Sequence, residues 1–189
     1  MELVLASASP RRREILAAAG IAFRVAVADI EERRATGEAP EAYARRLARE
    51  KAEAVARREP GVILAADTIV VLGDLILEKP LDAADAERML TLLAGRTHEV
   101  ITGFAIRHPG GEIDDAERTR VRFSPLSPAE IRDYVATGEP LDKAGAYAIQ
   151  GRASKYIEGV EGCYFNVVGL PVARVYGHLR ALGLGGPEE

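Results

Sequence analysis

Cysteine and tryptophan are scarce in this chain: of its 189 residues one is cysteine, Cys163, and none is tryptophan. A single cysteine excludes a disulfide within the chain. One cysteine and three scattered histidines also exclude a Cys/His zinc site of the usual spacing. We therefore expect the protein in a reducing compartment, the cytoplasm.

The chain also lacks a strong excess of one charge and a long apolar run. Its 25 basic and 29 acidic side chains give a formal net charge of −4, so any affinity for phosphate has to be local. Without a basic excess or an aromatic-basic stripe, stable nucleic-acid binding is not expected. No stretch reaches the roughly 18 consecutive apolar residues of a membrane span, and residues 1–5 have no basic flank of an export signal. We expect neither membrane insertion nor export.

The residues that are present are typical of one globular domain. Hydrophobic side chains make up 48% of the chain and charged ones 29%, and no segment repeats at a fixed period. A chain of this length can bury a core without disulfides or metals. We predict a single domain over residues 1–182 and a flexible tail over residues 183–189.

Apolar runs of strand length alternate with segments of helical period, which favours an α/β fold. The expected strands are residues 3–5, 23–27, 62–72, 99–107 and 115–123, and the expected helices are residues 11–19, 41–58, 83–93, a segment after Ser127, and 172–182. Helix punctuation supports these boundaries: Gly20 follows the first helix, Asp82 precedes the third helix and Gly95 ends it, and a capping box joins Ser127 and Glu130 before the fourth.

Pro109-Gly110-Gly111 predicts a hairpin, so the sheet is expected to be mixed rather than purely parallel. Residues 143–169 are spaced by glycines and predict short strands and loops. The expected architecture is a mixed, elongated central sheet with flanking helices and two lobes around a cleft.

Three arginines, Arg11 to Arg13, occupy the first turn of the first helix, after Ser9 as N-cap and Pro10 at N1. Cations at this end oppose the helix dipole, and a phosphate bound to the free N–H groups would resolve the conflict. The alternative is a solvated basic turn, since arginine is also a good helix former.

Acidic residues follow two of the predicted strands or interrupt them. Asp67 lies inside the apolar run 62–71, where an unpaired charge would cost several kcal/mol, so it is expected to have a cation, a metal or a catalytic task. Asp29, Glu31 and Glu32 are candidates to join it around magnesium, although a solvated loop is the simpler interpretation of these three.

Two lysines and one late loop complete the candidates. Lys51 and Lys79 are ordinary surface lysines unless a shared cleft brings them together. Residues 138–151 place polar side chains among glycines, which allows close backbone approach to a ligand. The alternative is an irregular connection in which Asp142 and Lys143 pair with each other.

In combination these segments resemble the Maf family of nucleoside triphosphate pyrophosphatases, nearly end to end. The resemblance is carried by Leu5-Ala6-Ser7-Ala8-Ser9-Pro10-Arg11-Arg12, Lys51-Ala52, Ala66-Asp67-Thr68, Lys79-Pro80, Ile101-Thr102-Gly103, Asp142-Lys143-Ala144-Gly145-Ala146-Tyr147, Ile149-Gln150-Gly151 and Val168-Gly169-Leu170-Pro171.

The resemblance implies hydrolysis of a nucleotide between its α and β phosphates, with Mg²⁺ or Mn²⁺, on a fold similar to the inosine triphosphatases. It implies Asp67 as the catalytic carboxylate, Glu32 and Asp67 as the acidic residues of the metal site, and a phosphate-binding set of Ser7, Arg11, Arg12, Lys51 and Lys79. A homodimer is expected from the resemblance alone.

Thr68 and Gln150, with Arg11, match the positions that select the base, and they resemble the branch acting on dTTP and UTP. A glutamine amide can donate to O4 and accept from N3–H of uracil or thymine, whereas a carboxylate suits a guanine edge. The alternatives are the same chemistry on 7-methyl-GTP or other bases, and a nucleotide-sensing regulator of septum formation. Asp67 and the lysines favour turnover over sensing.

Overall fold

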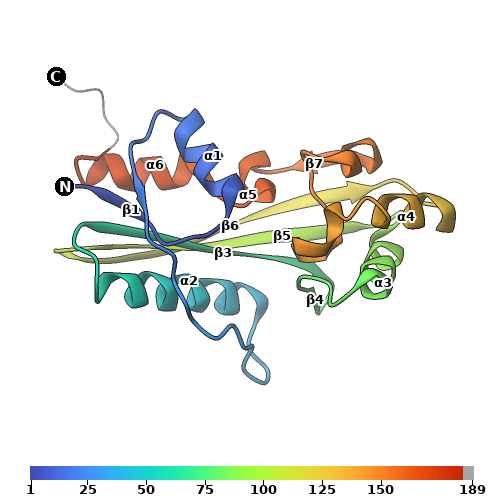
Figure 1. Cartoon of the computed structure of the whole chain (residues 1–189), viewed down its shortest axis with the longest axis horizontal. Coiled ribbons are helices and arrows are strands. Elements are labelled where there is room, and N and C mark those ends of the chain that lie inside the picture. Colours follow the sequence, from blue (N-terminus) through green and yellow to red (C-terminus); the bar gives the residue numbers. More distant parts are fainter. Residues whose placement is uncertain (185–189) are drawn as a thin grey trace. The chain divides into compact units, whose positions relative to one another are not determined.

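A computed structural model describes residues 1–184, and its strands form one mixed sheet (Figure 1). The strands are β1 (Leu3–Leu5), β2 (Arg24–Val25), β3 (Val62–Leu72), β4 (Leu75–Leu77), β5 (Thr97–His108), β6 (Gly111–Phe123) and β7 (Ile157–Glu161). Their order is β2-β1-β3-β5-β6-β7, with β4 beside β3. β1 is parallel to β2 and β3, whereas β4 is antiparallel to β3 and β7 to β6. The predicted mixed sheet is confirmed.

The helices are α1 (Pro10–Ala18), α2 (Pro40–Ala56), α3 (Ala83–Leu93), α4 (Pro128–Val135), α5 (Tyr164–Val168) and α6 (Val172–Ala181), with short 3₁₀ helices η1 (Glu139–Asp142), η2 (Ala144–Ala146) and η3 (Arg152–Tyr156). Side chains cap α1, α3 and α4 as predicted: Ser9, Asp82 and Ser127 each accept a backbone N–H of the first turn. The capping box between Ser127 and Glu130 is complete. No helix within residues 1–184 is both long and apolar enough to cross a bilayer.

The chain forms two compact units that interleave along the sequence. Within the described residues, unit 1 contains residues 1–67, 102–117 and 169–184, and unit 2 contains residues 68–101 and 118–168. The boundaries fall within β3, β5 and β6 and just after α5. Two units agree in number with the two predicted lobes, while the single domain over 1–182 and the cleft stay predictions.

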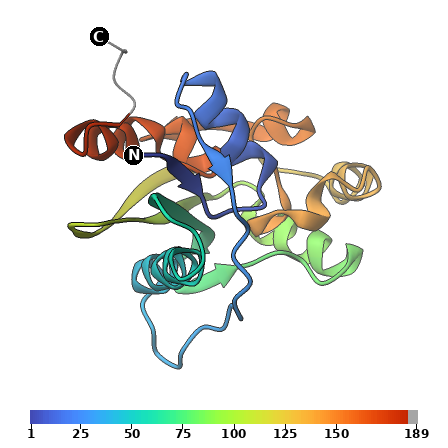
Figure 2. The ribbon, with the colours of Figure 1, turned by 60° about the vertical axis from the view of Figure 1, so that its left-hand side comes forward.

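Unit 1 has helices on both faces of its strands. α1 and α6 cover one face and α2 covers the other (Figures 1 and 2). Between α2 and the sheet, several of the buried side chains are small, among them Ala48, Ala52 and Ala65. Gly103 in β5 has no room for a side chain, because a Cβ there would lie 2.5 Å from the backbone of Ala44 in α2. Small residues therefore bring α2 close to the sheet.

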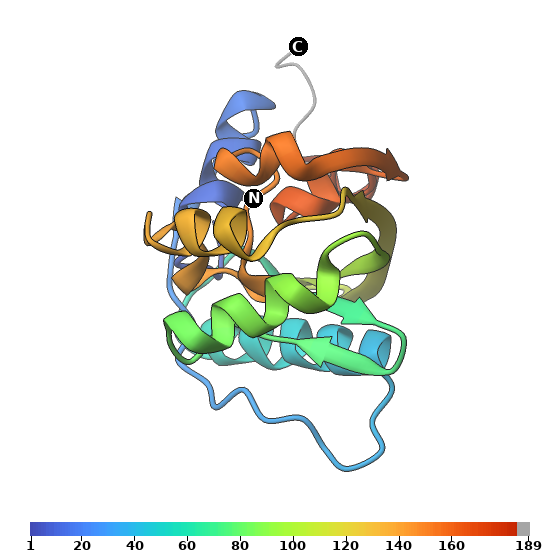
Figure 3. The same cartoon turned by 90° about the vertical axis from the view of Figure 1, so that its right-hand side faces the viewer.

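Unit 2 contains short helices together with its own portions of β3, β5 and β6. α3 packs against α4, and the 3₁₀ helices η1 and η2 contact this pair (Figure 3). Its interior holds an aromatic group in which His98 and Tyr147 each meet Phe123 edge to face, with ring centroids 5.2 and 4.8 Å away. These contacts join β5 and β6 to the segment after η2.

Residues 143–169 differ from the prediction of short strands and loops. They contain η2, η3, α5 and one strand, β7. Isolated 3₁₀ turns of three to five residues have no periodic apolar face, so the pattern of apolar residues did not distinguish them from loops. The second predicted strand, residues 23–27, is also shorter than expected and contains only Arg24–Val25.

The predicted tail begins as a helix cap. Gly183 has φ 76° and donates to Arg180 O, and the N–H of Leu184 donates to Leu179 O, which together close α6. The rest of that predicted tail, residues 185–189, lies outside the described residues.

Candidate active site

The β1–α1 turn is organised around one hydroxyl and one guanidinium. Ser7 is buried, and its Oγ accepts from Ser9 N at 3.2 Å and from Arg12 Nη1 at 3.2 Å. Arg12 Nε donates to Gly169 O at 2.8 Å, immediately before α6. Ser9 caps α1, whose first turn contains no acid. The chain therefore fixes a cationic side chain beside the N-terminus of a helix, where backbone N–H groups favour an anion.

Arg12 lies within electrostatic reach of both predicted carboxylates. Burial lowers the pKa of Arg12 from its ordinary value; the charge of Asp67 opposes this shift, Arg11 adds to it, and Glu32 opposes it. Asp67, Arg11 and Glu32 are thus close enough to act on the same guanidinium. Unit 1 brings together six residues that the sequence predicted as site residues: Ser7, Arg11, Arg12, Glu32, Lys51 and Asp67.

Lys51 joins the two carboxylates directly. Its Nζ lies 2.6 Å from Asp67 Oδ1 and 2.7 Å from Glu32 Oε1. The Lys51 and Asp67 side chains are 13% and 11% exposed, whereas that of Glu32 is 47% exposed. Asp67 is placed by β3 and Lys51 by α2, on the strand and helix that share the small-residue core. The buried carboxylate of Asp67 therefore has the cation that its position requires.

The pair of carboxylates, Asp67 and Glu32, fits a magnesium or manganese ion. Within residues 1–184 no group of three or more His, Cys, Asp or Glu side chains could hold a metal ion. Asp67 and Glu32 are nevertheless two carboxylates around one cation, Lys51 Nζ. Mg²⁺ is commonly bound by one or two carboxylates with waters and substrate phosphates as the other ligands. This donor set suits a metal that arrives with a polyphosphate better than a resident ion.

Of the three acidic residues predicted to follow the second strand, Glu32 is the one bound to Lys51. Glu31 pairs with Arg33 at 2.8 Å, and both side chains are well exposed. The segment is held by Glu38, which accepts from Arg46 Nε at 2.7 Å and from Ala35 N at 3.1 Å. Hydrogen bonds from Arg46 lower the pKa of Glu38 to about 2. This pair attaches the segment that carries Glu32 to α2.

The remaining predicted residues, Thr68, Lys79 and Gln150, belong to unit 2. Thr68 is half-buried in β3, and Lys79 and Gln150 are exposed. The N–H of Gly145 donates to Glu78 O at 3.1 Å, so η2 lies beside the segment of Lys79.

Asp142 and Lys143 form an ion pair at 2.6 Å, which was the alternative interpretation of that loop. In the next residues Gly145 and Ala146 have positive φ values of 69° and 58°. For alanine this conformation is strained, a feature that clusters at binding and catalytic loops.

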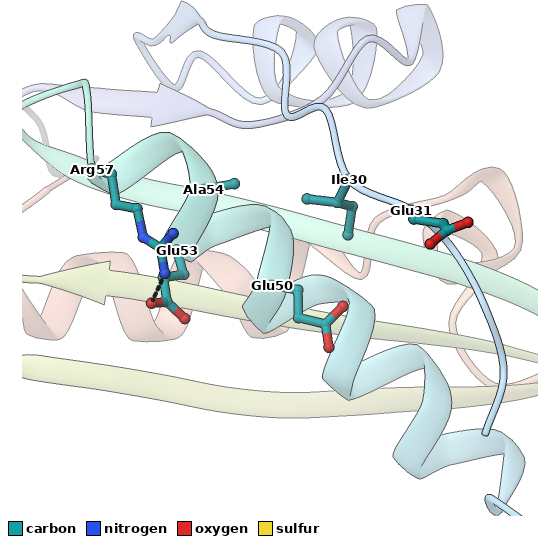
Figure 4. Close-up of a pocket in the computed structure, with 6 residues that line it drawn as sticks. All are labelled: Ile30, Glu31, Glu50, Glu53, Ala54 and Arg57. Carbon is teal, nitrogen blue, oxygen red and sulfur yellow. Dashed lines mark hydrogen bonds and ion pairs between the residues drawn. The ribbon is translucent and has the colours of Figure 1, made fainter.

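Unit 1 also has a hollow in its surface, beside α2 (Figure 4). It is lined by Ile30, Glu31, Glu50, Glu53, Ala54 and Arg57. Arg57 Nη2 already pairs with Glu53 at 2.8 Å, as the dashed line in Figure 4 marks. Three carboxylates around one paired arginine disfavour a phosphate here, so this hollow is not the candidate site.

The sequence did not point to Tyr134, and it offered Glu139 only as one polar residue of the segment 138–151, although the two support the turn that carries Gln150. Tyr134 Oη donates to Glu139 Oε1 at 2.8 Å, and Glu139 accepts from Arg152 N at 3.0 Å. The one available signal was Gly151, whose lack of a side chain leaves space for a carboxylate.

The fold and these side chains define a mixed α/β protein that holds a partly buried lysine between two carboxylates near a cationic helix N-terminus. Residues 2–182 match a family model described as Maf-like protein, and the chain belongs to the Maf family.

Two relatives of this chain carry the same name. A dTTP/UTP pyrophosphatase of Koribacter versatilis (strain Ellin345) is 54% identical over 185 residues, which cover 97% of this chain and 96% of the relative. A dTTP/UTP pyrophosphatase of Myxococcus xanthus (strain DK1622) is 56% identical over 185 residues, covering 96% and 93%. Among solved structures, a nucleoside-triphosphatase / dITP/XTP pyrophosphatase of Mycobacterium abscessus aligns over 97% of this chain and 96% of that chain, with 17% identity and a TM-score of 0.43.

Proposed function

We propose that this protein hydrolyses dTTP and UTP between the α and β phosphates, giving the nucleoside monophosphate and pyrophosphate. The observation that carries the proposal is the group of Lys51, Asp67 and Glu32, with contacts of 2.6 and 2.7 Å, near Arg12. The cations of this group, Lys51 and Arg12, suit the negative charge of a polyphosphate substrate. Relatives at 54% and 56% identity are named for this activity.

The cationic side chains would bind the phosphates. Arg12 is held by Ser7 and Gly169, so its guanidinium loses little further freedom when a phosphate binds. Arg11 and Lys79 of unit 2 belong to the same proposed set of phosphate-binding residues. Lys51, from α2, is the further cation of this set. Positive charge near the departing pyrophosphate lowers the barrier, because negative charge develops there during the reaction.

Asp67 is the proposed catalytic carboxylate. It would either accept a proton from the attacking water or hold a divalent metal together with Glu32. A bound Mg²⁺ or Mn²⁺ would neutralise part of the negative charge of the phosphates. In either role Lys51 holds the Asp67 carboxylate at a fixed point before substrate binds.

Base preference is assigned to Gln150 and Thr68, with Arg11. The amide of Gln150 can donate to O4 and accept from N3–H of uracil or thymine, and its exposure leaves it accessible to a nucleotide. The cytoplasmic location and the homodimer also stay proposals, and sedimentation of the purified protein tests the second.

The test is incubation of the purified protein with dTTP, UTP, GTP and 7-methyl-GTP plus Mg²⁺, with pyrophosphate and orthophosphate assayed separately. We expect pyrophosphate as the first product and a preference for dTTP and UTP. Orthophosphate as the first product would refute the proposed bond cleavage. Asp67→Asn should reduce kcat by at least about a hundredfold while dTTP binding stays measurable, since the amide keeps the shape and loses the charge.

A further inference from the structure

The backbone turn that carries Gln150 is held on both sides by one carboxylate and one phenol of unit 2. Before Gln150, the N–H of Ala148 donates to Tyr134 Oη at 3.2 Å. After it, the N–H of Arg152 donates to Glu139 Oε1 at 3.0 Å and Oε2 at 3.2 Å. Tyr134 Oη in turn donates to Glu139 Oε1 at 2.8 Å. The two side chains are therefore joined by a hydrogen bond, and together they hold the backbone two residues before and two residues after Gln150.

Gly151 shows how closely the carboxylate approaches the turn. A Cβ on this residue would lie 2.2 Å from Glu139 Oε1, so any side chain here would force the Glu139 carboxylate to move. The φ of Gly151 is −96°, which other residues adopt easily, so the role of this glycine is to leave space for the Glu139 carboxylate and not to provide a special backbone conformation. The turn is completed by a hydrogen bond from Gly151 N to Ala148 O at 3.1 Å.

The backbone of Glu139 is held by two neighbouring side chains. Its N–H donates to Thr137 Oγ1 at 3.2 Å, and its carbonyl accepts from Lys143 Nζ at 2.8 Å. Tyr134 projects from α4, which begins at the complete capping box of Ser127. Burial raises the pKa of Tyr134, and the hydrogen bond to Glu139 adds to this, so the phenol stays a donor to the carboxylate. The pair is therefore set before any ligand binds.

We propose that Glu139 is a positioning residue for base selection: it fixes, with Tyr134, the backbone on which Gln150 presents its amide. The inference rests on the proposed function, in which Gln150 contacts the base. Discrimination by hydrogen bonding requires the donor and acceptor of the amide to meet O4 and N3–H together, so a change in the turn weakens the preference. Glu139 is assigned no contact with substrate.

The test measures kcat/KM for dTTP and GTP in Glu139→Gln, in Gly151→Ala and in the control Glu158→Gln. Glu158 is an exposed carboxylate of β7 in the same unit, 3.2 Å from Arg122. The glutamine at 139 keeps the size of the side chain but removes the charge and one acceptor, and the alanine at 151 displaces the carboxylate. We expect the dTTP/GTP ratio to fall by about tenfold in both variants, mainly through KM for dTTP, and to stay unchanged in the control.

A second arm separates positioning from general damage to the fold. In a Gln150→Ala background, Glu139→Gln should leave the ratio where Gln150→Ala alone has set it, because the effect passes through Gln150. An unchanged ratio in Glu139→Gln, or an equal additional fall in the Gln150→Ala background, would overturn the inference.

Hydrogen exchange distinguishes this inference from the proposed function. Without any nucleotide, amide exchange of residues 148–152 should become at least about tenfold faster in Glu139→Gln than in the wild type, as local opening becomes easier. Unchanged exchange overturns the positioning role whatever the enzyme hydrolyses. A wild type that cleaves neither dTTP nor UTP refutes the proposed function and, with it, base selection by this turn.

Discussion

His98 should make the folded protein less stable as the pH falls from about 6.5 to about 4. Its side chain is 2% exposed, and its Nε2 lies 2.8 Å from Tyr147 Oη. Burial lowers the pKa of His98 from 6.5 to about 4. The folded state therefore keeps the ring neutral at pH values where the unfolded chain already binds a proton there.

The size of the effect follows from these two pKa values. A difference of about 2.5 pH units, at 1.36 kcal/mol per unit, corresponds to about 3 kcal/mol of unfolding free energy. Because the pKa in the folded state is the lower one, this stability is complete above pH 6.5 and is lost as the pH falls through 4. Between pH 7 and pH 5 the loss should be about 2 kcal/mol. Glu38, with its pKa lowered from 4.5 to about 2, affects stability at lower pH than this interval.

The assay is urea unfolding at half-unit steps from pH 7 to pH 5, for the wild type, His98→Gln and His108→Gln. His98→Gln removes the buried titrating ring, and His108 is the partly exposed histidine at the end of β5. We expect the pH dependence to flatten by about 2 kcal/mol in His98→Gln and to persist in His108→Gln. Equal pH dependence in His98→Gln and the wild type would refute the reasoning. If His98→Gln does not fold, an NMR titration of His98 in the wild type gives the same answer, and a midpoint near 6.5 refutes it.

Five further substitutions, two of them controls, test the site and the packing. Arg12→Ala should weaken dTTP binding about tenfold to a hundredfold and dTMP binding less, whereas the exposed Arg13→Ala should have little effect; equal loss for both nucleotides contradicts the phosphate role. Gln150→Glu should lower the ratio of kcat/KM for dTTP over GTP, because the carboxylate repels O4, and an unchanged ratio would show that Gln150 does not contact the base. Gly103→Ala should lower the unfolding free energy by about 1–3 kcal/mol through a clash with α2, while Gly177→Ala, with open space around it, should raise it by about 0.5–1 kcal/mol in thermal or urea unfolding.

The parts of the fold that the sequence predicts well are those with a periodic apolar pattern or a local cap. β3 begins and ends at the predicted residues 62 and 72, and α3 at 83 and 93. The hairpin at Pro109 and Gly110 is confirmed by adjacent β5 and β6. These features depend on interactions within about a dozen residues, which the sequence displays directly.

The parts that the sequence could not predict depend on contacts between distant residues. The Lys51 contact with Glu32 requires a segment without regular structure to return to α2, and no periodicity signals this. Glu139 and Arg152 are 13 positions apart, and their hydrogen bond follows from the geometry of two 3₁₀ turns. Asp67 was identified because burying an unpaired carboxylate inside an apolar strand costs free energy. This argument uses the position of Asp67 alone and does not say which residue pairs with it.

The hydrogen bond from Arg12 to Gly169 has a consequence for biosynthesis. Its two residues are 157 positions apart, so a ribosome has to release most of the chain before the turn after β1 acquires its full set of contacts. Contacts of such long sequence separation close late in folding. During synthesis a nascent chain that contains Ser7, Arg12, Lys51 and Asp67 should therefore bind nucleotide poorly until α6 has emerged, and fragments that stop before Gly169 should not accumulate as active enzyme.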